Sequence, residues 1–524
     1  MARLKALLRR FKHDERGAFL ALFGIMTIAL VATGGAVVDF VSVDQARNRA
    51  QLALDSSVLA LQPDIYTKTE AEIMNAAQAL LTQRLANSSI TATVDEITIN
   101  EEDGSLFLNT SLTVPTYFVD LVGVDYVSFN VSAQATRKKL FVEVAFVLDN
   151  SGSMGAQSRM TNLKKATKSA TNILFYGADP KPSGATKLEN TKISVVPFAY
   201  FVNIGSQYKD ASWMDQAGVS SISNDNFDDD NNDATPFNGA VDRFALYDSM
   251  INTSWKGCVE ARPGQYGIDD TPPSTSDPDS LFVPVFAPDN PDKKGYYNKY
   301  LKDSGGACPN NPKVWKLSHR ERQERLCKYT GAKPTDDYGP NGYCLDTSIL
   351  PLTDDVSSIV SKIDAMKSNG WTNIHQGAMW GFHALSPTAP FSEGADYDQA
   401  TSKVMIIMTD GQNTFPTSSN MNGSRILSAY GHLSTGRLGA PGVNTGLSNT
   451  ATMNALTVKT CEAARAEGIV IYSIGLEAPN SATKNMLRDC ATDSSKVFFP
   501  SAASELNSVF KTIAEQLSNL RIES

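Results

Sequence analysis

The first strong hydrophobic pattern in the chain is an uncharged run of 22 residues over 17–38. As a helix this run would span about 33 Å, close to the roughly 30 Å of a bilayer's hydrocarbon core. Buried core helices are rarely uncharged for so long, and the apolar region of a signal peptide normally covers only about 7–15 residues. Helical character continues beyond residue 38, so we predict a retained transmembrane helix over 17–38.

Residues 39–139 change from a helical to an alternating pattern. One long helix or two are predicted over 39–88. Alternating apolar positions and β-branched residues then predict strands over 90–100, 105–118 and 127–137. A helix followed by a small antiparallel sheet is typical of a pilin-like α+β segment, although a generic α+β stalk would give the same pattern.

From residue 140 the chain alternates between strand and helix patterns. The strands are near-continuous apolar runs, as expected when helices cover both faces of a sheet. We therefore predict an α/β fold with a doubly wound, mostly parallel sheet over 140–520. Predicted strands are 141–149, 192–198, 403–409 and 469–475, and predicted helices are 162–174, 353–368, 374–384, 450–467 and 503–520.

The alternation is interrupted between about 200 and 346. Nine prolines fall within 263–312, which excludes a continuous helix or a central strand there. Four of the six cysteines lie in the same region, so we predict a large, loop-rich insertion stapled by disulfides. The acidic run 225–233 lacks the glycine and glutamate of an EF-hand loop; it is a solvated loop or, less favoured, a loose Ca²⁺ site.

Charge and cysteine usage indicate on which side of a membrane each part lies. Residues 1–16 carry six basic and two acidic side chains, so the net charge of −9 leaves −13 on the rest of the chain. This balance argues against a nucleic-acid partner. A basic arm over 1–16 predicts that this end stays cytoplasmic and that the chain after residue 39 is exported. Six cysteines without a CxxC spacing then favour disulfides. Cys461 and Cys490 are a plausible pair, and the other four leave three connectivities open.

Oxygen-bearing side chains follow two predicted strands of the sheet. Asp149 ends one strand and Asp410 follows another, and ligand sites form at the carboxyl ends of parallel strands. Ser151, Ser153 and Thr372 could add hydroxyl oxygens. Two carboxylates and three hydroxyls suit Mg²⁺, with Mn²⁺ or Ca²⁺ also compatible. Taken singly, each residue could instead be a helix cap or a turn former.

The segments DNSGSM, TNIHQG and MTDG, in this order, resemble the metal-ion-dependent adhesion site of von Willebrand factor A domains. This resemblance implies a Rossmann-like fold and a divalent cation held by Asp149, Ser151, Ser153, Thr372 and Asp410. It also implies that a protein partner completes the cation's shell with a carboxylate. The interval of 223 residues from Asp149 to Thr372 is longer than such a domain usually needs, and the predicted insertion accounts for the excess.

The segments ERGAFLALFGIMTIALVATGGAVVDF and QARNRAQLALDSSVLAL resemble the amino-terminal part of TadE and TadG proteins of the Tad (Flp-type) pilus, and later segments resemble TadG-type proteins with an A domain. The resemblance implies a bacterial inner-membrane protein whose exported part serves pilus assembly or adhesion and binds other pilus components. A structural pilus component, in which the metal only stabilises the fold, is the alternative. A metal-dependent hydrolase is disfavoured, because no general base or nucleophile accompanies the aspartates and His375 is better interpreted as a packed residue.

Overall fold

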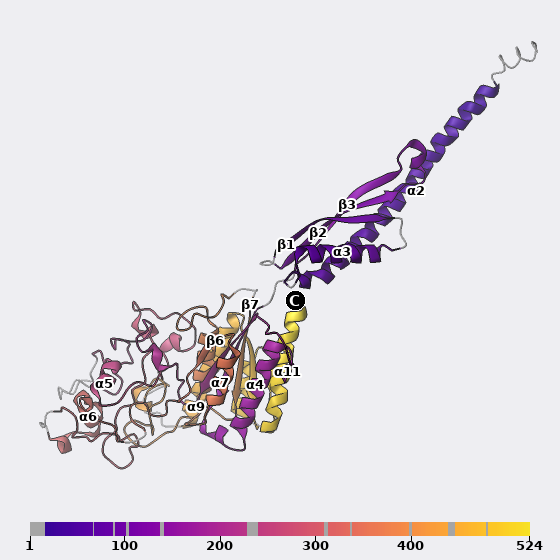
Figure 1. Ribbon diagram of the computed structural model, residues 1–524. Coiled ribbons are helices and arrows are strands. Elements are labelled where there is room, and N and C mark those ends of the chain that lie inside the picture. Colours follow the sequence, from indigo (N-terminus) through magenta and orange to yellow (C-terminus); the bar gives the residue numbers. More distant parts are fainter. Residues whose placement is uncertain are drawn as a thin grey trace, which may run out of the picture. The chain divides into compact units, whose positions relative to one another are not determined.

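A computed structural model of the chain divides at Lys139 and Leu140 into two compact units (Figure 1). The structure describes residues 16–66, 68–86, 90–100, 104–136, 141–227, 239–308, 313–335, 338–397, 401–438, 446–477 and 480–523. The predicted basic arm therefore lies outside the described residues, apart from Arg16, and so does most of the acidic run 225–233.

The first unit is built on one long helix, α2 (Arg16–Leu61), of 46 residues. From Leu22 onward α2 is long and apolar enough to cross a bilayer, a test that signal sequences and buried core helices also pass. The helix passes through a short 3-10 turn, η1 (Gln62–Tyr66), to α3 (Glu70–Arg84). A capping box between Thr69 and Glu72 begins α3 by satisfying its first backbone N–H groups.

Three antiparallel strands complete the first unit: β1 (Thr91–Asn100), β2 (Ser105–Pro115) and β3 (Tyr126–Thr136), in the order β1-β2-β3. Side chains of β2 alternate between half-buried and buried along its whole length. Its buried leucines pack with apolar residues of α2 and α3 in one core. The predicted strands are therefore present, with the second ending three residues before its predicted boundary.

The second unit contains a six-stranded sheet in the order β6-β5-β4-β7-β8-β9. All neighbouring pairs are parallel except β5 and β6. The sequence did not predict β6 or β9, because segments of four and two residues are too short to show a period. The strands are β4 (Phe141–Asp149), β5 (Thr191–Phe198), β6 (Leu350–Thr353), β7 (Thr401–Thr409), β8 (Val470–Gly475) and β9 (Val497–Phe498).

Each face of this sheet has its own hydrophobic core. Ala145 and Val147 of β4 belong to a core shared with α8 (Ile374–Leu385), α9 (Gly446–Ala466) and α10 (Ser481–Cys490). The alternate residues of β4, such as Phe146, belong to a core shared with three other helices. These are α4 (Arg159–Tyr176), α7 (Val356–Ala365) and α11 (Leu506–Glu523). The prediction of a mixed α/β fold is confirmed.

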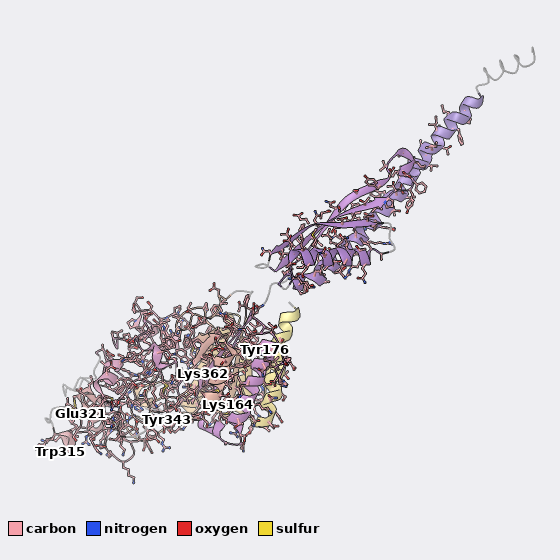
Figure 2. All side chains as sticks on the ribbon, viewed as in Figure 1. Lys164, Tyr176, Trp315, Glu321, Tyr343 and Lys362 are labelled. Carbon is pink, nitrogen blue, oxygen red and sulfur yellow. A yellow bond between two sulfur atoms is a disulfide. The ribbon has the colours of Figure 1, made fainter. Side chains whose placement is uncertain are left out.

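A surface contact joins two helices of the second face. Lys164 of α4, labelled in Figure 2, donates to the backbone carbonyl of Asp364 on α7 at 2.9 Å, and Lys168 pairs with the carboxylate of Asp364 at 2.8 Å. Such exposed pairs contribute little stability, typically less than about 1 kcal/mol. The burial of apolar side chains against the sheet therefore holds these helices in place.

The connection from β5 to β6 covers residues 199–349. In its described part only short helices interrupt the loops, among them α5 (Arg243–Ser249) and α6 (His319–Glu324), and its strand pairing is limited to isolated bridges (Figure 1). Its aromatic side chains pack on one another; for example, Phe286 contacts Tyr247 and Tyr329 at centroid distances of 4.9 and 5.0 Å. The connection is a folded, loop-rich layer.

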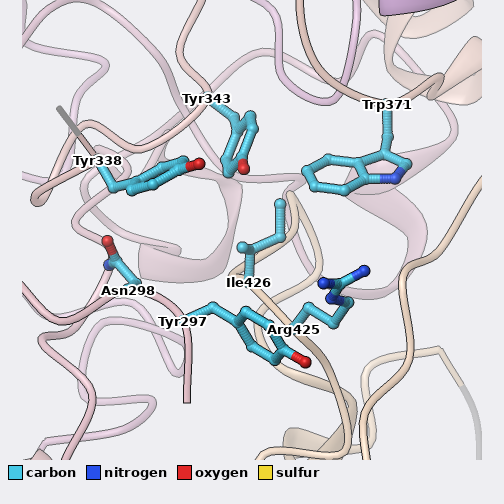
Figure 3. Close-up of a pocket in the computed structure, with 7 residues that line it drawn as sticks. All are labelled: Tyr297, Asn298, Tyr338, Tyr343, Trp371, Arg425 and Ile426. Carbon is cyan, nitrogen blue, oxygen red and sulfur yellow. The ribbon is translucent and has the colours of Figure 1, made fainter. Parts of the chain in front are cut away.

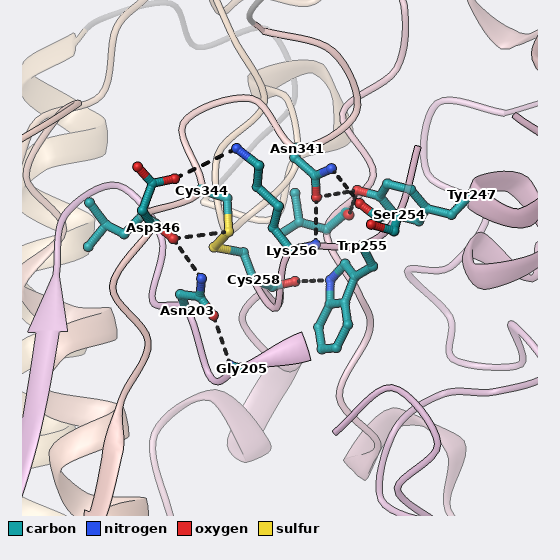
Figure 4. Close-up of a disulfide and its surroundings, with 12 residues drawn as sticks. Asn203, Gly205, Tyr247, Ser254, Trp255, Lys256, Cys258, Asn341, Cys344 and Asp346 are labelled. Carbon is teal, nitrogen blue, oxygen red and sulfur yellow. Dashed lines mark hydrogen bonds and ion pairs between the residues drawn. A yellow bond between two sulfur atoms is a disulfide. The ribbon is translucent and has the colours of Figure 1, made fainter. Parts of the chain in front are cut away.

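Three disulfides use all six cysteines: Cys258–Cys344, Cys308–Cys327 and Cys461–Cys490. The pairing proposed for Cys461 agrees with this arrangement, and the structure selects one of the three connectivities for the other four. Asn203, five residues after β5, lies next to the first disulfide and links both halves of the connection (Figure 4). Its backbone bridges to Cys258, and its side-chain amide donates to the carbonyl of Leu345 at 2.6 Å.

Candidate functional site

The candidate site lies at the carboxyl ends of two adjacent parallel strands. Asp149 is the last residue of β4, and Asp410 directly follows Thr409, the last residue of β7. Because Leu148 is in register with Met408, both strands reach this edge of the sheet together. Both carboxylates are withdrawn from solvent, since Asp149 and the side chain of Asp410 are 0% exposed.

A chain of short polar contacts connects four of the predicted site residues. Asp149 Oδ1 accepts a hydrogen bond from the backbone N–H of Ser151 at 2.7 Å. The hydroxyls of Ser151 and Ser153 are 3.0 Å apart, and Ser153 Oγ donates to Asp410 Oδ1 at 2.6 Å. Ser153 is exposed while Ser151 and Asp149 are buried, so the group opens to solvent on the Ser153 side.

Thr372, the fifth predicted residue, belongs to a loop that is bound to the first one. The N–H of Gly152 donates to the carbonyl of Gly370 at 2.9 Å, and the N–H of Asn369 donates to the carbonyl of Asn150 at 2.7 Å. The helix cap of α8 is Asn373, whose side chain accepts from the N–H of Gln376. The hydroxyl of Thr372 is therefore not used as that cap.

Gly411 leaves room between the hydroxyls of Thr372 and Ser153. A Cβ atom placed on Gly411 would lie 3.8 Å from Thr372 Oγ1 and 4.0 Å from Ser153 Oγ. The hydroxyls of Thr372 and Ser153, from segments far apart in the sequence, thus lie near each other at Gly411, the residue after Asp410. All five predicted residues therefore meet at the same edge of the sheet.

Two further residues of the site were missed by sequence reasoning. Thr409 Oγ1 donates to Asp149 Oδ2 at 2.6 Å, so both carboxylate oxygens of Asp149 accept hydrogen bonds. Arg159, the first residue of α4, donates to Asp410 Oδ2 at 2.8 Å and also pairs with Glu477, just beyond β8. No motif marks either residue, because each acts through a contact made only in the folded chain.

The two aspartates differ in their electrostatic environment. Arg159 supplies a positive charge next to Asp410, whereas within the described residues no basic side chain pairs with Asp149. Burial raises the pKa of Asp149 to about 7, and repulsion from Asp410 adds to this; hydrogen bonds from Thr409 and Ser151 act in the opposite direction. A cation at this edge would offset the charge of Asp149, which the protein itself leaves uncompensated.

The donor set fits a hard divalent cation. Carboxylate and hydroxyl oxygens are the ligands that Mg²⁺ prefers, with water at the remaining positions. The described residues contain no cluster of three or more His, Cys, Asp or Glu side chains that could hold a metal. A cation bound here would therefore depend on Ser151, Ser153 and Thr372 as well as on the two carboxylates.

The raised pKa of Asp149 predicts that a cation held by its carboxylate would bind more weakly in acid. An unfolded Asp titrates near 3.9, so between about pH 4 and pH 7 the folded, cation-free protein holds a proton here that the unfolded chain has lost. The contribution of Asp149 to stability is therefore full below about pH 4 and is lost as the pH rises through about 7. Because a cation must displace this proton, its affinity is expected to fall about tenfold per pH unit below about pH 7. Calorimetric titration with Mg²⁺ across this range measures the slope, and a pH-independent affinity would contradict it.

His375 is a packed residue, as predicted. It is 1% exposed, and its ring nitrogens lie 2.7 Å from the hydroxyl of Tyr430 and 2.8 Å from the carbonyl oxygen of Gly267. Burial lowers the pKa of His375 to about 4, so the ring is neutral at physiological pH. With both nitrogens engaged in the core, His375 holds α8 against neighbouring loops.

An aromatic cavity of about 160 Å³ adjoins the Thr372 loop (Figure 3). Trp371, directly before Thr372, forms part of its wall, and its ring meets that of Tyr343 edge-on with a centroid distance of 4.7 Å. The guanidinium carbon of Arg425 lies over the ring of Tyr297, 4.4 Å from the ring centroid. The cavity offers aromatic faces and one exposed positive charge beside the candidate site. Its lining residues are Tyr297, Asn298, Tyr338, Tyr343, Trp371, Arg425 and Ile426.

No protein-family model and no curated protein matches this chain. Among solved structures, the pilus adhesin SpaC from Lactobacillus rhamnosus GG matches at 11% identity with a TM-score of 0.33, covering 82% of this chain and 34% of SpaC. The adhesive tip pilin GBS104 from Group B Streptococcus agalactiae matches at 11% identity and a TM-score of 0.32, over 82% of this chain and 68% of GBS104. The vWF domain of the type V pili tip protein Mfa5 from Porphyromonas gingivalis matches at 11% identity and a TM-score of 0.31, over 73% of this chain and 96% of that domain. Likeness at this level carries no functional argument, so the proposal below rests on the site.

Proposed function

We propose that the second unit is a von Willebrand factor A domain that binds a protein partner through a divalent cation. The observation that carries this proposal is the meeting of Asp149, Ser151, Ser153, Thr372 and Asp410 at one sheet edge. The sheet order and the two covered faces fit a doubly wound, Rossmann-like A domain. The β5–β6 connection is then an insertion into that domain.

We further propose that the chain is a TadG-type component of a Tad/Flp pilus system. The apolar helix α2 would anchor it in the bacterial inner membrane, with the second unit in the periplasm or at the cell surface. The disulfides support an exported location, because such bonds persist in oxidising compartments. The partner would be another protein of the pilus machinery.

In this proposal the five residues would hold the cation, most plausibly Mg²⁺, with Mn²⁺ or Ca²⁺ as alternatives. The cation would supply a coordination position for a carboxylate of the partner. Ser153 lies on the exposed side of the group, from which the partner would approach.

Other residues would position the two carboxylates. Arg159 holds Asp410 in place, and Asp149 is fixed by Thr409 and by the N–H of Ser151. A partner side chain next to the carboxylate would lie against the aromatic cavity at Trp371.

Crosslinking of the full-length protein in its native membranes tests this proposal. Partner capture is expected in Mg²⁺ and is expected to be lost in a chelator, because the partner binds to the cation. Trp371→Ala is expected to weaken capture several-fold by removing aromatic contact area while leaving the Mg²⁺-dependent rise in Tm unchanged.

The same two measurements separate adhesion from a purely structural role of the cation. If Mg²⁺ raises Tm but capture is equal with and without chelator, the cation only stabilises the fold and the adhesive proposal is wrong. If neither capture nor Tm responds to Mg²⁺, the metal site itself is wrong.

A further inference from the structure

The connection between β2 and β3, together with the first residue of β3, exposes an unusual concentration of apolar side chains. It includes the short 3-10 helix η2 (Val119–Val122), none of whose residues is buried. Within ten residues, five large apolar or aromatic side chains are 45–66% exposed. We call these five residues the hairpin patch: Tyr117, Leu121, Val122, Val124 and Tyr126.

Hydrogen bonds hold the hairpin patch against α2 at the level of Asp39 along the helix. The carboxylate of Asp39 accepts hydrogen bonds from the backbone N–H groups of Tyr117, Phe118 and Val119, at 3.1, 2.8 and 2.8 Å. Gly35 permits the close approach, since a Cβ there would lie 2.2 Å from Phe118 Cβ. The hairpin is therefore fixed at the end of the uncharged run 17–38, where a spanning helix would leave the hydrocarbon core.

The surface of α2 next to Asp39 is apolar as well. Val37, Val38, Phe40 and Val41 are 48–72% exposed. With about 3.6 residues per turn, these four side chains point away from the face of α2 that holds the hairpin, so apolar side chains are exposed on both sides of that contact. Scattered exposed apolar residues are normal on a soluble surface, whereas nine large ones gathered along one short stretch of the unit indicate contact with another apolar phase.

We infer that the hairpin patch lies in the interfacial layer of the bilayer leaflet through which α2 leaves the hydrocarbon core, near Asp39. The inference rests on the proposed membrane anchor and adds a second point of contact to it. Tyr117 and Tyr126 suit the headgroup level, where tyrosine is enriched, and the aliphatic side chains between them suit the acyl boundary. Asp120 and Asp125 lie in the same connection, so the surface that fits is zwitterionic rather than anionic.

A second copy of the chain fits this patch less well than lipid. A stable protein interface needs about 800 Å² per partner, or roughly 20–30 residues, and the hairpin patch has five. Its position at the end of the uncharged run places it next to lipid headgroups whenever α2 spans a bilayer. Two contacts on one leaflet would fix the depth of α2 and limit its tilt, which a single helix does not do.

A nitroxide depth measurement tests the inference on the full chain in phosphatidylcholine vesicles. All six native cysteines are paired, so one added cysteine gives one labelling site. Val122→Cys tests the hairpin patch, Leu30→Cys tests the anchor, and Glu96→Cys, on the exposed side of β1, is the aqueous control. Labels at 122 and 30 are expected to relax faster with oxygen than with a water-soluble nickel complex, and the label at 96 is expected to show the reverse.

The outcomes are distinct. A lipid signature at 30 with an aqueous signature at 122 would overturn the inference while the anchor stands. Aqueous signatures at both positions would overturn the anchor itself. Spectral broadening at 122 that grows with the protein-to-lipid ratio, without oxygen enrichment, would show a second copy on the patch and would also overturn the inference.

Discussion

Asp149→Asn is expected to abolish divalent-cation binding without destabilising the cation-free protein. Asparagine is nearly isosteric with aspartate, and its amide can keep the contacts to the Ser151 N–H and to Thr409 Oγ1. The substitution removes a buried carboxylate that faces Asp410 without a cationic partner of its own. We therefore expect the cation-free variant to be at least as stable as the wild type near neutral pH. The loss of one charged ligand should weaken Mg²⁺ binding by more than about 100-fold, because changes in outer-shell partners alone cost about 10–100-fold.

Thermal unfolding with and without Mg²⁺ measures both effects. At a free Mg²⁺ concentration of about 100 times the wild-type Kd, the wild type should gain about 2.7 kcal/mol and the variant less than about 0.4 kcal/mol. Asp364→Asn is the matched control, because Asp364 is an exposed carboxylate whose only ion pair is with Lys168 in the described structure. That control should keep the full Mg²⁺ response. A response in Asp149→Asn equal to that of the wild type would show that the cation binds elsewhere.

Removal of the Cys258–Cys344 disulfide is expected to cause the largest loss of stability among the three bridges. The bridge closes a loop with a sequence separation of 86, so the chain-entropy model predicts a loss of about 4.6 kcal/mol for Cys258→Ala with Cys344→Ala. Next to this bridge, Asn203 near the start of the β5–β6 connection donates a hydrogen bond to the carbonyl of Leu345 near its end. The connection should loosen at the point where it enters and leaves the sheet.

The Cys308–Cys327 bridge supplies an internal comparison. Its sequence separation is 19, for which the same model predicts a loss of about 3.3 kcal/mol. Denaturant unfolding of the two double variants should show the larger shift for Cys258–Cys344, and hydrogen exchange should show faster opening of the connection than of β4. Equal or reversed losses would mean that the folded connection is held by its packing and not by this bridge.

The central strands and the candidate site could be predicted because their signals are local. The apolar run of β4 ends at Asp149, that of β7 is followed by Asp410 and that of β8 ends at Gly475, and a parallel sheet brings such ends to one edge. The metal-ligand assignment of the five residues remains a prediction, although their meeting at that edge is observed.

What the sequence missed depends on contacts between distant segments. Arg159 begins a helix as an ordinary surface arginine would, and only folding brings it to Asp410 and Glu477. The edge strand β6 is held by two register positions against β5, too few to leave a period in the sequence. The aromatic cavity draws its walls from four separate parts of the chain, so no local pattern could indicate it.

The order of the strands has a consequence for folding during synthesis. β4 is one of the two middle strands of the sheet. Its neighbour on one side, β7, ends at Thr409, which lies 260 residues beyond Asp149. At a synthesis rate of about 5–20 residues per second, one edge of β4 stays unpaired for roughly 13–50 s after the strand has been made. Such an apolar edge is a template for aggregation. We therefore expect the chain to need protection from aggregation, for example by a holding chaperone, until β7 pairs with β4 and the site at their ends can form.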